Sequence, residues 1–468
     1  MTGNTQPHVR VIGGGLAGCE AAWQLANAGC TVELWEMKPH KRTPAQVSDH
    51  LAELVCSNSF RSNQIGNAVG LIKEEMRLAG GFIMACAEKA KVPAGDALAV
   101  DREQFAASVE SQLLANRRIE LVRQEAESLP LDDIPTIVAT GPLTSEKLAA
   151  DIAKACGDER LFFFDAIAPI IEHDSIDMEH AYFKSRWDKG DADDYLNCPM
   201  TESEFHTFLE ALLKADRIDA KDFEEAHADD AHYFEGCLPI EVMAERGPQT
   251  LTFGPMKPVG LHDPRTGNRP YAVLQLRKEN IHGTAYNMVG CQTRLKQPSQ
   301  REVFKLIPAL RNATFFRYGA IHRNTYLDAP RVLDDRLAVG RGTESRPTLF
   351  FAGQITGVEG YVESTACGMM TAMMVLDMLA DAPFDKPPET TMMGGLYRHV
   401  RGHIQADPKR GYQPSNVNWS MIPPIPAEGK ARKKSKKDKR AELSQRAVAD
   451  WSSWLQARKE KGLWAGSR

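Results

Sequence analysis

The sequence predicts an α/β fold in which a parallel-sheet domain is interrupted by a mixed α+β inserted domain and followed by a basic tail. A strand, turn, helix and second strand open the chain, and a strand, glycine turn and long apolar helix return at 348–379. Between them the sequence is richer in acidic residues, and 271–277 and 284–292 are expected to pair antiparallel. The predicted boundaries are 1–165 and 326–425 for the two parts of the first domain, 166–325 for the inserted domain and 426–468 for the tail.

Hydrophobic periodicity and turn residues predict the elements of the first domain. Short apolar runs rich in β-branched residues indicate strands, and apolar residues at helical spacing indicate helices. Gly29 is well placed to end the first helix. The predicted strands are 9–12, 31–35 and 136–139, and the predicted helices are 16–28, 68–91 and 100–114.

The composition is that of an ordinary globular protein, with 43% hydrophobic and 25% charged residues among 468. The chain opens without a basic and then apolar segment, and no apolar run reaches the roughly 18 residues that span a bilayer. Neither a signal peptide nor a membrane partner is therefore expected. Nine scattered cysteines without metal-site spacing predict reduced thiols, a cytoplasmic protein and no bound metal.

The turn after the first strand has the Gly13-x-Gly15-x-x-Gly18 spacing of a dinucleotide-binding motif. The first glycine makes a tight turn, the second admits a pyrophosphate, and the third lets helix and strand pack closely. The free N–H groups at the start of the helix would bind the phosphates, and Glu36 would accept hydrogen bonds from the ribose hydroxyls. A glycine turn packed for purely steric reasons is the alternative. The expected cofactor-binding residues are Gly13, Gly14, Gly15, Leu16, Ala17, Gly18 and Glu36.

Two later segments favour FAD over a nicotinamide cofactor. Ala139-Thr140-Gly141 ends a strand, as a similar segment does in many flavoproteins, and 350–354 resembles their second FAD segment, which makes Gly353 and Gln354 candidates. Gln354 replaces the usual acid, so a carboxylate contact to the ribityl chain is not expected. A helix beginning near Gly360 would direct its N-terminal dipole at the flavin.

These segments belong to a longer resemblance. The chain resembles the folate- and FAD-dependent tRNA (uracil-5-)-methyltransferases, the TrmFO family, between about residues 9 and 366. The matching strings include VIGGGLAGCEAAWQLANAG, AELVCSNSFRSN, FEGCLPIEVMAERG, YGAIHRNTY and FAGQITGVEGYVES. The resemblance implies an FAD domain with an insertion and methylation of carbon 5 of the T-loop uridine in tRNA. Methylenetetrahydrofolate would supply the carbon, and NADH or NADPH would reduce the flavin.

The resemblance also implies catalytic residues. Cys237 matches the family's nucleophile, whose thiolate adds to carbon 6 of uracil, and Cys56 matches the base that removes the carbon 5 proton. His322 is a candidate to stack on the pterin of the folate. Without the resemblance, a cysteine is more often a small core residue and a lone histidine more often structural. Lys257, Arg277, Arg294 and Arg323 are left as candidates for an RNA surface or for the folate glutamate.

Three other functions fit parts of the sequence. The same chemistry on a ribosomal RNA uridine fits, because nothing in the chain identifies the RNA. A related tRNA-wobble flavoprotein is disfavoured by the cysteine of GCLPIE and by the lack of a long C-terminal helical domain. A non-catalytic RNA-binding flavoprotein is disfavoured by the presence of both Cys56 and Cys237.

The tail carries charge of the opposite sign from the rest of the chain. Residues 426–468 hold 13 Lys and Arg against 5 Asp and Glu, a balance of +8, so a net charge of −5 leaves −13 elsewhere. The run 430–440 is predicted to be disordered without a partner and to contact tRNA phosphates; a solvated tail is the alternative. Beyond it, one helix face is predicted to dock on the body through Leu443, Ala447, Val448, Trp451, Trp454 and Leu455.

Overall fold

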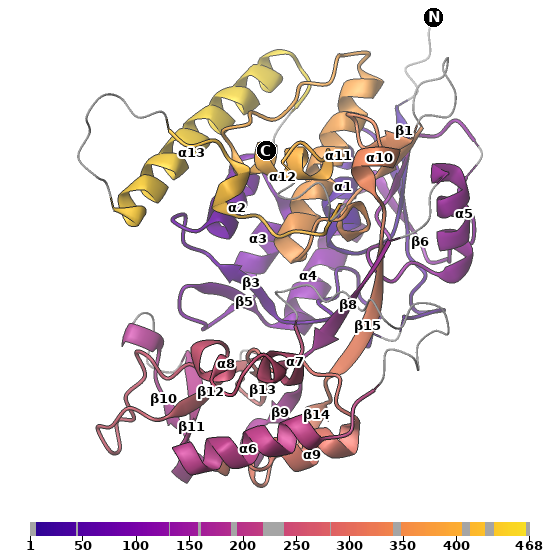
Figure 1. Ribbon diagram of the computed structural model, residues 1–468. Helices are drawn as coiled ribbons and strands as arrows, with labels where there is room; N and C mark the ends of the chain where they lie inside the picture. Colours follow the sequence, from indigo (N-terminus) through magenta and orange to yellow (C-terminus); the bar gives the residue numbers. More distant parts are fainter. Residues whose placement is uncertain are drawn as a thin grey trace, which may run out of the picture.

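In the computed structural model, a six-stranded sheet forms the centre of the larger part of the molecule (Figure 1). Its inner strands are parallel, and only the edge strand β16 pairs antiparallel. Val9, Val11 and Ile12 are all buried on β1, as expected of a central parallel strand that is covered on both faces. In sheet order the strands are β16 (Ala338–Val339), β17 (Leu349–Phe351), β7 (Thr136–Val138), β1 (His8–Ile12), β2 (Thr31–Trp35) and β6 (Ile119–Val122).

The structure describes residues 6–43, 45–130, 132–157, 161–188, 194–218, 238–280, 282–339, 348–404, 412–425 and 435–464. For 161–167 and 320–325 it describes the backbone only.

Helices α1 (Leu16–Asn27) and α11 (Tyr361–Leu379) pack closely against each other. A Cβ atom on Gly368 would lie 2.2 Å from the carbonyl oxygen of Ala17, so this glycine permits the close approach of the two helices. A Cβ atom on Gly18 would lie 1.9 Å from the carbonyl oxygen of Gly13. Gly18 therefore allows the turn to fold back against its own helix.

The remaining elements of this part surround the sheet, and they largely follow the predicted ranges. A single predicted helix over 68–91 is wrong, because the chain forms two helices that are separated at Gly80, where φ is +79°. Both share the core built around the large sheet. These elements are β3 (Ser59–Ser62), α2 (Ala68–Leu78), α3 (Phe82–Lys89), β4 (Lys91–Val92), β5 (Ala97–Val100), α4 (Arg102–Ala115), α5 (Glu146–Cys156), α10 (Ala329–Val332) and α12 (Met392–Val400).

A second sheet, entirely antiparallel, has a hydrophobic core of its own. The expected pair is confirmed: β12 and β13 are antiparallel, with Leu276 opposite Met288. In sheet order the strands are β10 (Tyr182–Phe183), β11 (Tyr195–Met200), β12 (Ala272–Lys278), β13 (Ala285–Met288), β9 (Ile170–Glu172) and β14 (Phe315–Arg317). The helices of this part are α6 (Glu202–Lys214), α7 (Ile240–Glu245), α8 (Thr250–Phe253) and α9 (Gln297–Phe304).

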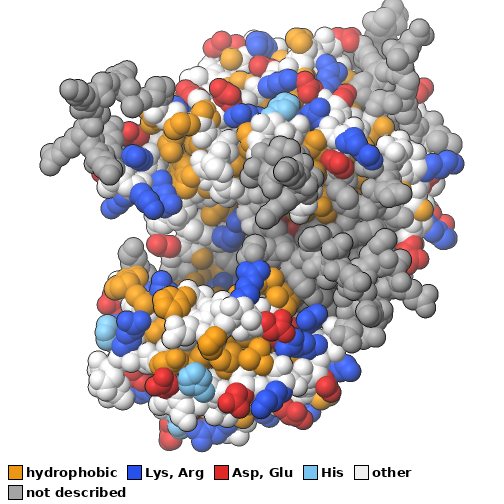
Figure 2. All heavy atoms as spheres, viewed as in Figure 1, with side chains coloured by type: hydrophobic (Ala, Val, Ile, Leu, Met, Phe, Trp, Pro, Cys, Tyr) orange, Lys and Arg blue, Asp and Glu red, His pale blue; other side chains and the backbone are white. Residues whose placement is uncertain are grey.

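Two long strands connect the two parts of the molecule. The strand β8 (Leu161–Ile167) leads into the second part, and β15 (Ala320–Tyr326) leads back; they pair antiparallel along their whole length. Figure 1 shows this pair running between the two parts, and Figure 2 shows the surface hollowed between them on the visible face.

The C-terminal helix α13 (Lys436–Glu460) confirms the predicted docking face. Ala447, Trp451, Trp454 and Leu455 are buried in the first core, and Leu443 and Val448 pack against it. The predicted disorder of 430–440 is wrong for its second half, because residues 436–440 form the first turns of this helix. A side-chain cap provides the reason: the Ser435 hydroxyl oxygen accepts the Asp438 N–H at 3.1 Å. Residues 430–434 lie outside the described residues.

Helix α11 is the one described helix that is long and apolar enough to cross a membrane. Its candidate window is 83% buried inside the fold, which is the behaviour of a core helix.

Candidate cofactor and catalytic site

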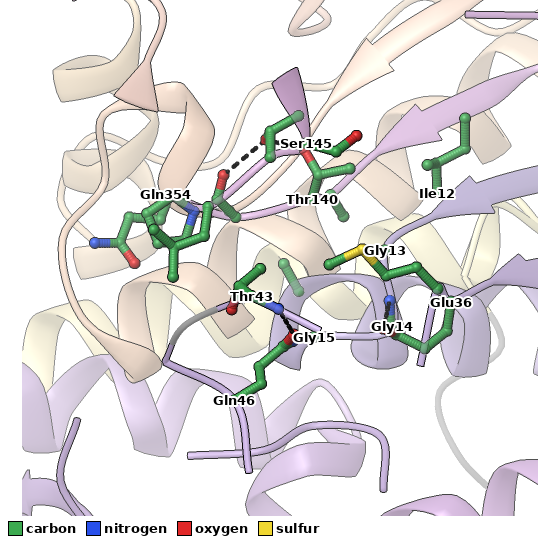
Figure 3. Close-up of a pocket in the computed structure, with 18 of the residues that line it drawn as sticks. Ile12, Gly13, Gly14, Gly15, Glu36, Thr43, Gln46, Thr140, Ser145 and Gln354 are labelled. Atoms are coloured by element: carbon green, nitrogen blue, oxygen red, sulfur yellow. Dashed lines mark hydrogen bonds between the residues drawn. The ribbon is translucent and has the colours of Figure 1, made fainter. Parts of the chain in front are cut away.

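A pocket lies where the carboxyl ends of β1, β2, β7 and β17 meet the start of α1 (Figure 3). Its empty volume is about 1070 Å³, including the space at its mouth that is open to solvent. The carboxyl ends of parallel strands gather at one edge of a sheet, and ligands of open α/β sheets bind there. The lining segments are 12–17, 35–37, 124–126, 139–145 and 353–354, with several single residues from the intervening loops.

The glycine turn shapes one wall of this pocket. Gly13 has a φ of +111°, and a Cβ atom there would lie 2.4 Å from the carbonyl oxygen of Ala139. By contrast, a Cβ atom on Gly15 would meet nothing within 4 Å. Among the described residues, no acceptor is recorded for the N–H groups of Gly15, Leu16 and Ala17. These N–H groups at a helix start can therefore bind an anion in the pocket.

Glu36 is fixed at the opposite side of the turn. Its Oε2 accepts the N–H of Gly14 at 3.0 Å, and its Oε1 accepts the N–H of Lys38 at 2.9 Å. The residue is buried but lines the pocket. A carboxylate has about four lone-pair sites. After the two backbone bonds, it can still accept hydroxyl protons from a ligand.

The other two predicted segments complete the pocket wall. Gly141 has a φ of +70° and precedes Thr144, whose hydroxyl donates to the Gly141 carbonyl at 3.2 Å. Gly353 has a φ of +80°, and a Cβ atom there would lie 2.8 Å from the Ala17 side chain. Gln354 donates through Nε2 to Glu359 at 2.8 Å. Gln354 lines the pocket, whereas its partner Glu359 does not.

Tyr361 links the pocket to the Cys56 loop. It begins α11 and lines the pocket, and its phenolic oxygen accepts the N–H groups of Cys56 at 2.7 Å and Ser57 at 3.0 Å. Burial raises the pKa of the Tyr361 phenol well above its ordinary value, so the group stays neutral. The half-buried Cys56 thiol is therefore carried by a loop that is hydrogen-bonded to a pocket residue.

The second part of the molecule holds the same loop from its other side. Arg277, on β12, donates through Nε to Asn58 and through Nη2 to the Ser57 hydroxyl, both at 3.0 Å. Asn58, fully buried, donates through Nδ2 to the Lys278 carbonyl at 2.8 Å. Arg277 is 7% exposed, so of its two candidate roles the place on an RNA surface is wrong: burial and these bonds make it a structural partner of the loop.

Arg102 joins both parts at the same point. From the start of α4 it donates through Nε to Glu279 at 2.7 Å and through Nη1 to the Leu54 carbonyl at 2.6 Å. Its Nη2 lies 3.4 Å from the Cys56 carbonyl oxygen. Tyr361 lies in the matching string FAGQITGVEGYVES and Arg277 was a candidate for other contacts, but sequence reasoning missed both of them, and Arg102, as partners of Cys56.

The structure gives no side-chain position for two of the predicted site residues. Cys237 falls outside the described residues. His322 lies on β15 opposite Asp165 of β8, and only its backbone is described.

The other described cysteines behave as packing residues. Burial raises the pKa of the Cys30, Cys86 and Cys156 thiols to about 11. Cys19, Cys198, Cys291 and Cys367 are also buried, and burial raises their pKa. No group of three or more His, Cys, Asp or Glu able to hold a metal occurs among the described residues.

Comparison with known proteins agrees with this architecture. Solved structures of Aquifex aeolicus GidA in two crystal forms match with TM-scores of 0.67 and 0.66. They cover 98% of this chain and 77% and 74% of theirs, at 14% and 13% identity. At that identity the match establishes the fold alone.

Sequence relatives are much closer. The family model for glucose inhibited division protein A matches residues 8–383. A methylenetetrahydrofolate–tRNA-(uracil-5-)-methyltransferase TrmFO from Anaeromyxobacter dehalogenans is 53% identical over 444 residues, which is 95% of each chain. One of the same name from Rhodospirillum rubrum is 51% identical over 458 residues, covering 96% of this chain and 92% of that protein. The chain therefore belongs to the glucose inhibited division protein A family and, within it, to the TrmFO group.

Proposed function

We propose that this protein methylates carbon 5 of the T-loop uridine in tRNA, forming 5-methyluridine, with FAD and methylenetetrahydrofolate as cofactors. Its relatives at about half identity over nearly the full length carry the name of this activity. The structural observation that supports it most is Tyr361, which lines the dinucleotide pocket and accepts hydrogen bonds from the Cys56 loop. A redox cofactor and a reactive thiol would then share one site.

The pocket residues fit FAD. The N–H groups of Gly15, Leu16 and Ala17 would bind the pyrophosphate, and the fixed carboxylate of Glu36 would accept the ribose hydroxyls. Their neighbours Gly13, Gly14 and Gly18 shape this turn, and Gly141, Gly353 and Gln354 line or flank the rest of the pocket. When bound, reduced FAD supplies electrons and methylenetetrahydrofolate supplies the carbon.

The thiols act on the uracil itself. Cys237 would add to carbon 6, which makes carbon 5 nucleophilic, and Cys56 would remove the carbon 5 proton after the new bond has formed. Once the exocyclic methylene has been reduced to a methyl group, the Cys237 thiolate would be expelled from carbon 6. His322 would stack on the pterin. For Cys237 and His322 the support is the family sequence match alone. NADH or NADPH would regenerate the reduced flavin, and the expected compartment is the cytoplasm.

One assay tests the activity. Unmodified tRNA transcript is incubated with purified protein, NADPH or NADH, and methylenetetrahydrofolate labelled in its methylene group, and the product base is mapped. Label is expected in the methyl group of one T-loop uridine. Parallel incubations replace the folate with methyl-labelled S-adenosylmethionine or the tRNA with ribosomal RNA. Label that enters only from S-adenosylmethionine, or that appears only in ribosomal RNA, would refute the proposal.

A second assay tests the two thiols. RNA carrying 5-fluorouridine should form a covalent complex, because fluorine cannot leave as a cation after addition at carbon 6. Cys237→Ala should abolish the complex, whereas Cys56→Ala should be inactive and still form it. A complex that persists in Cys237→Ala would assign the nucleophile to another residue.

A further inference from the structure

The first turns of α13 extend beyond the body of the protein. Residues 435–441 are all exposed, and attachment begins with Leu443, which packs against the first core, and Ser444, whose hydroxyl donates to the Ile65 carbonyl at 2.8 Å. From there the helix is anchored firmly: the indole N–H of Trp451 donates to the Glu75 carbonyl at 2.6 Å. The Arg458–Asp377 ion pair is fully buried. The projecting turns are therefore held in a fixed position.

Four of the first five residues of this helix are basic: Lys436, Lys437, Lys439 and Arg440. None of their side chains forms an ion pair with a described residue. A helix N-terminus carries partial positive charge, so cations in the first turn destabilise the helix rather than support it. Asp438 belongs to the Ser435 cap, and Glu442 follows the basic residues. The basic residues thus have no role within the helix itself.

Lys436, Lys437 and Arg440 line a groove whose opposite wall is the loop between β3 and α2. The groove has an empty volume of about 1620 Å³, and its wall includes the amide side chains of Gln64 and Asn67. The exposed acid in the groove, Asp96, already accepts a hydrogen bond from Gln64 at 3.0 Å. Lys439 does not line the groove.

The groove is connected to the candidate site by β3. This strand follows the Cys56 loop and ends one residue before the loop that forms the groove wall. The eight residue-to-residue steps from Cys56 to Gln64 span no more than about 30 Å even when fully extended. Figure 2 shows Lys and Arg side chains gathered where α13 begins, at the edge of the hollow between the two parts of the molecule.

We propose that Lys436, Lys437 and Arg440, here called the α13 basic surface, bind the phosphate backbone of the RNA whose uridine reaches the Cys56 site. The proposal rests on the proposed function for the identity of the RNA. Cationic side chains without partners attract phosphates irrespective of base sequence, and such contacts position a nucleic acid rather than select its bases. The surface would therefore add affinity and orientation, not sequence specificity.

The test is the salt dependence of tRNA binding, measured by fluorescence anisotropy with full-length protein and labelled transcript. The triple variant Lys436→Gln, Lys437→Gln, Arg440→Gln keeps helix propensity while it removes three charges. Its affinity is expected to fall at least tenfold near 0.1 M salt, and its log–log salt slope should flatten by about 2 to 3, since each phosphate contact accounts for roughly 0.7 to 0.9.

A matched control removes the same charge from α13 and from Lys461, the residue that caps its C-terminus, away from the groove: Lys439→Gln, Lys459→Gln, Lys461→Gln. Lys461 pairs with Asp385 at 3.3 Å, a contact on which the groove does not depend. The tRNA affinity of this control should stay within about twofold of wild type, and its log–log salt slope should stay within about 0.7. Flavin content and circular dichroism confirm that both variants fold. Deleting α13 is not a suitable test, because it would expose the core surface that Trp451 and Leu455 cover.

The outcomes separate the two proposals. Equal losses in both triple variants, or no loss in the groove variant, would overturn the α13 basic surface. Loss of binding to phosphatidylglycerol vesicles with RNA binding intact would assign the surface to lipid and also overturn it. Wild-type protein that binds tRNA with the expected salt slope but transfers no methyl group would refute the proposed function alone.

Discussion

The Gly13–Gly18 turn and the Cys56–Asn58 loop both lie against helix α11, but different kinds of group hold them. The turn is shaped by backbone: its glycines fit against the carbonyl oxygens of Gly13 and Ala139, and its carboxylate partner is 22 residues away. The loop is held by side chains from far along the chain. Tyr361 is 305 residues from Cys56, and Arg277 is 220 residues from Ser57.

This difference predicts that the two regions respond differently to substitution. Changes in the turn should act on cofactor binding directly, because the backbone there is the binding surface. The loop depends on the second part of the molecule being docked against the first. Substitutions at its distant partners should therefore alter chemistry at Cys56 while leaving the bound flavin in place.

The largest effect is expected in the turn. Gly15→Val adds a side chain where the protein leaves at least 4 Å of open space, so the fold should remain intact while the pyrophosphate position is filled. FAD affinity should fall about 100-fold or more, roughly the 3 kcal/mol upper range for overpacking a close contact. Flavin absorbance per protein and the melting temperature measure the two properties.

Gly18→Val is the contrasting substitution. Its Cβ atom would lie 1.9 Å from the Gly13 carbonyl oxygen, so it should lower the melting temperature as well as the flavin content. Full flavin occupancy in Gly15→Val would show that the turn does not bind the cofactor.

The next effect concerns the docking of the two parts. Arg102→Met should lower the free energy of unfolding by about 2 kcal/mol, because Glu279 is left buried without its cation. This is less than the roughly 3–5 kcal/mol of a fully buried pair, since the Arg102 side chain is 20% exposed. Urea denaturation measures it. The double variant with Glu279→Leu should recover stability; if it does not, the charge pair is not the cause.

A smaller effect is expected at Tyr361. Tyr361→Phe removes one acceptor for two N–H groups, and this loss should cost about 1.4 kcal/mol, or tenfold in the single-turnover methylation rate. Flavin content should stay near wild type. A loss of flavin that matches the loss of rate would mean that Tyr361 serves the pocket rather than the loop.

The smallest effect is a pH dependence of stability that arises at β3, the strand that follows the loop. Buried Lys73 donates to the carbonyls of Phe60 and Arg61 on β3, and burial lowers its pKa to about 7 from an ordinary 10.5. Between these values the unfolded chain binds the extra proton, so the contribution of Lys73 to the free energy of unfolding should rise by about 1 kcal/mol from pH 7 to 8. Burial raises the pKa of Glu75 to about 8, and its contribution falls over the same interval.

Below pH 7 both states bind that proton, and the contribution of Lys73 to the pH dependence ends. The free energy of unfolding of the wild type relative to Lys73→Met should therefore rise between pH 7 and 8, while the variant keeps its flavin. A difference between the two proteins that does not change with pH would assign the pH dependence to another group.

The sequence by itself determined the features that depend on neighbouring residues. The pattern β1-α1-β2, the glycine turn, the position of Glu36 and the apolar face of α13 all follow from periodicity and from steric needs within a few tens of residues. Its errors were also local: a positive φ at Gly80 divided one predicted helix, and the Ser435 cap began α13 earlier than expected.

Only the tertiary structure decided what surrounds Cys56. Its partners are ordinary residues of other elements: Tyr361 and Arg102 each begin a helix, and Arg277 lies on a strand. They are 46 to 305 residues from the loop along the chain, and no sequence spacing relates them to its thiol. Their hydrogen bonds exist because α11 packs against α1 and because the β8–β15 pair returns the second part of the molecule to the first. Periodicity reports which face of an element is buried, but it does not report which distant element covers that face.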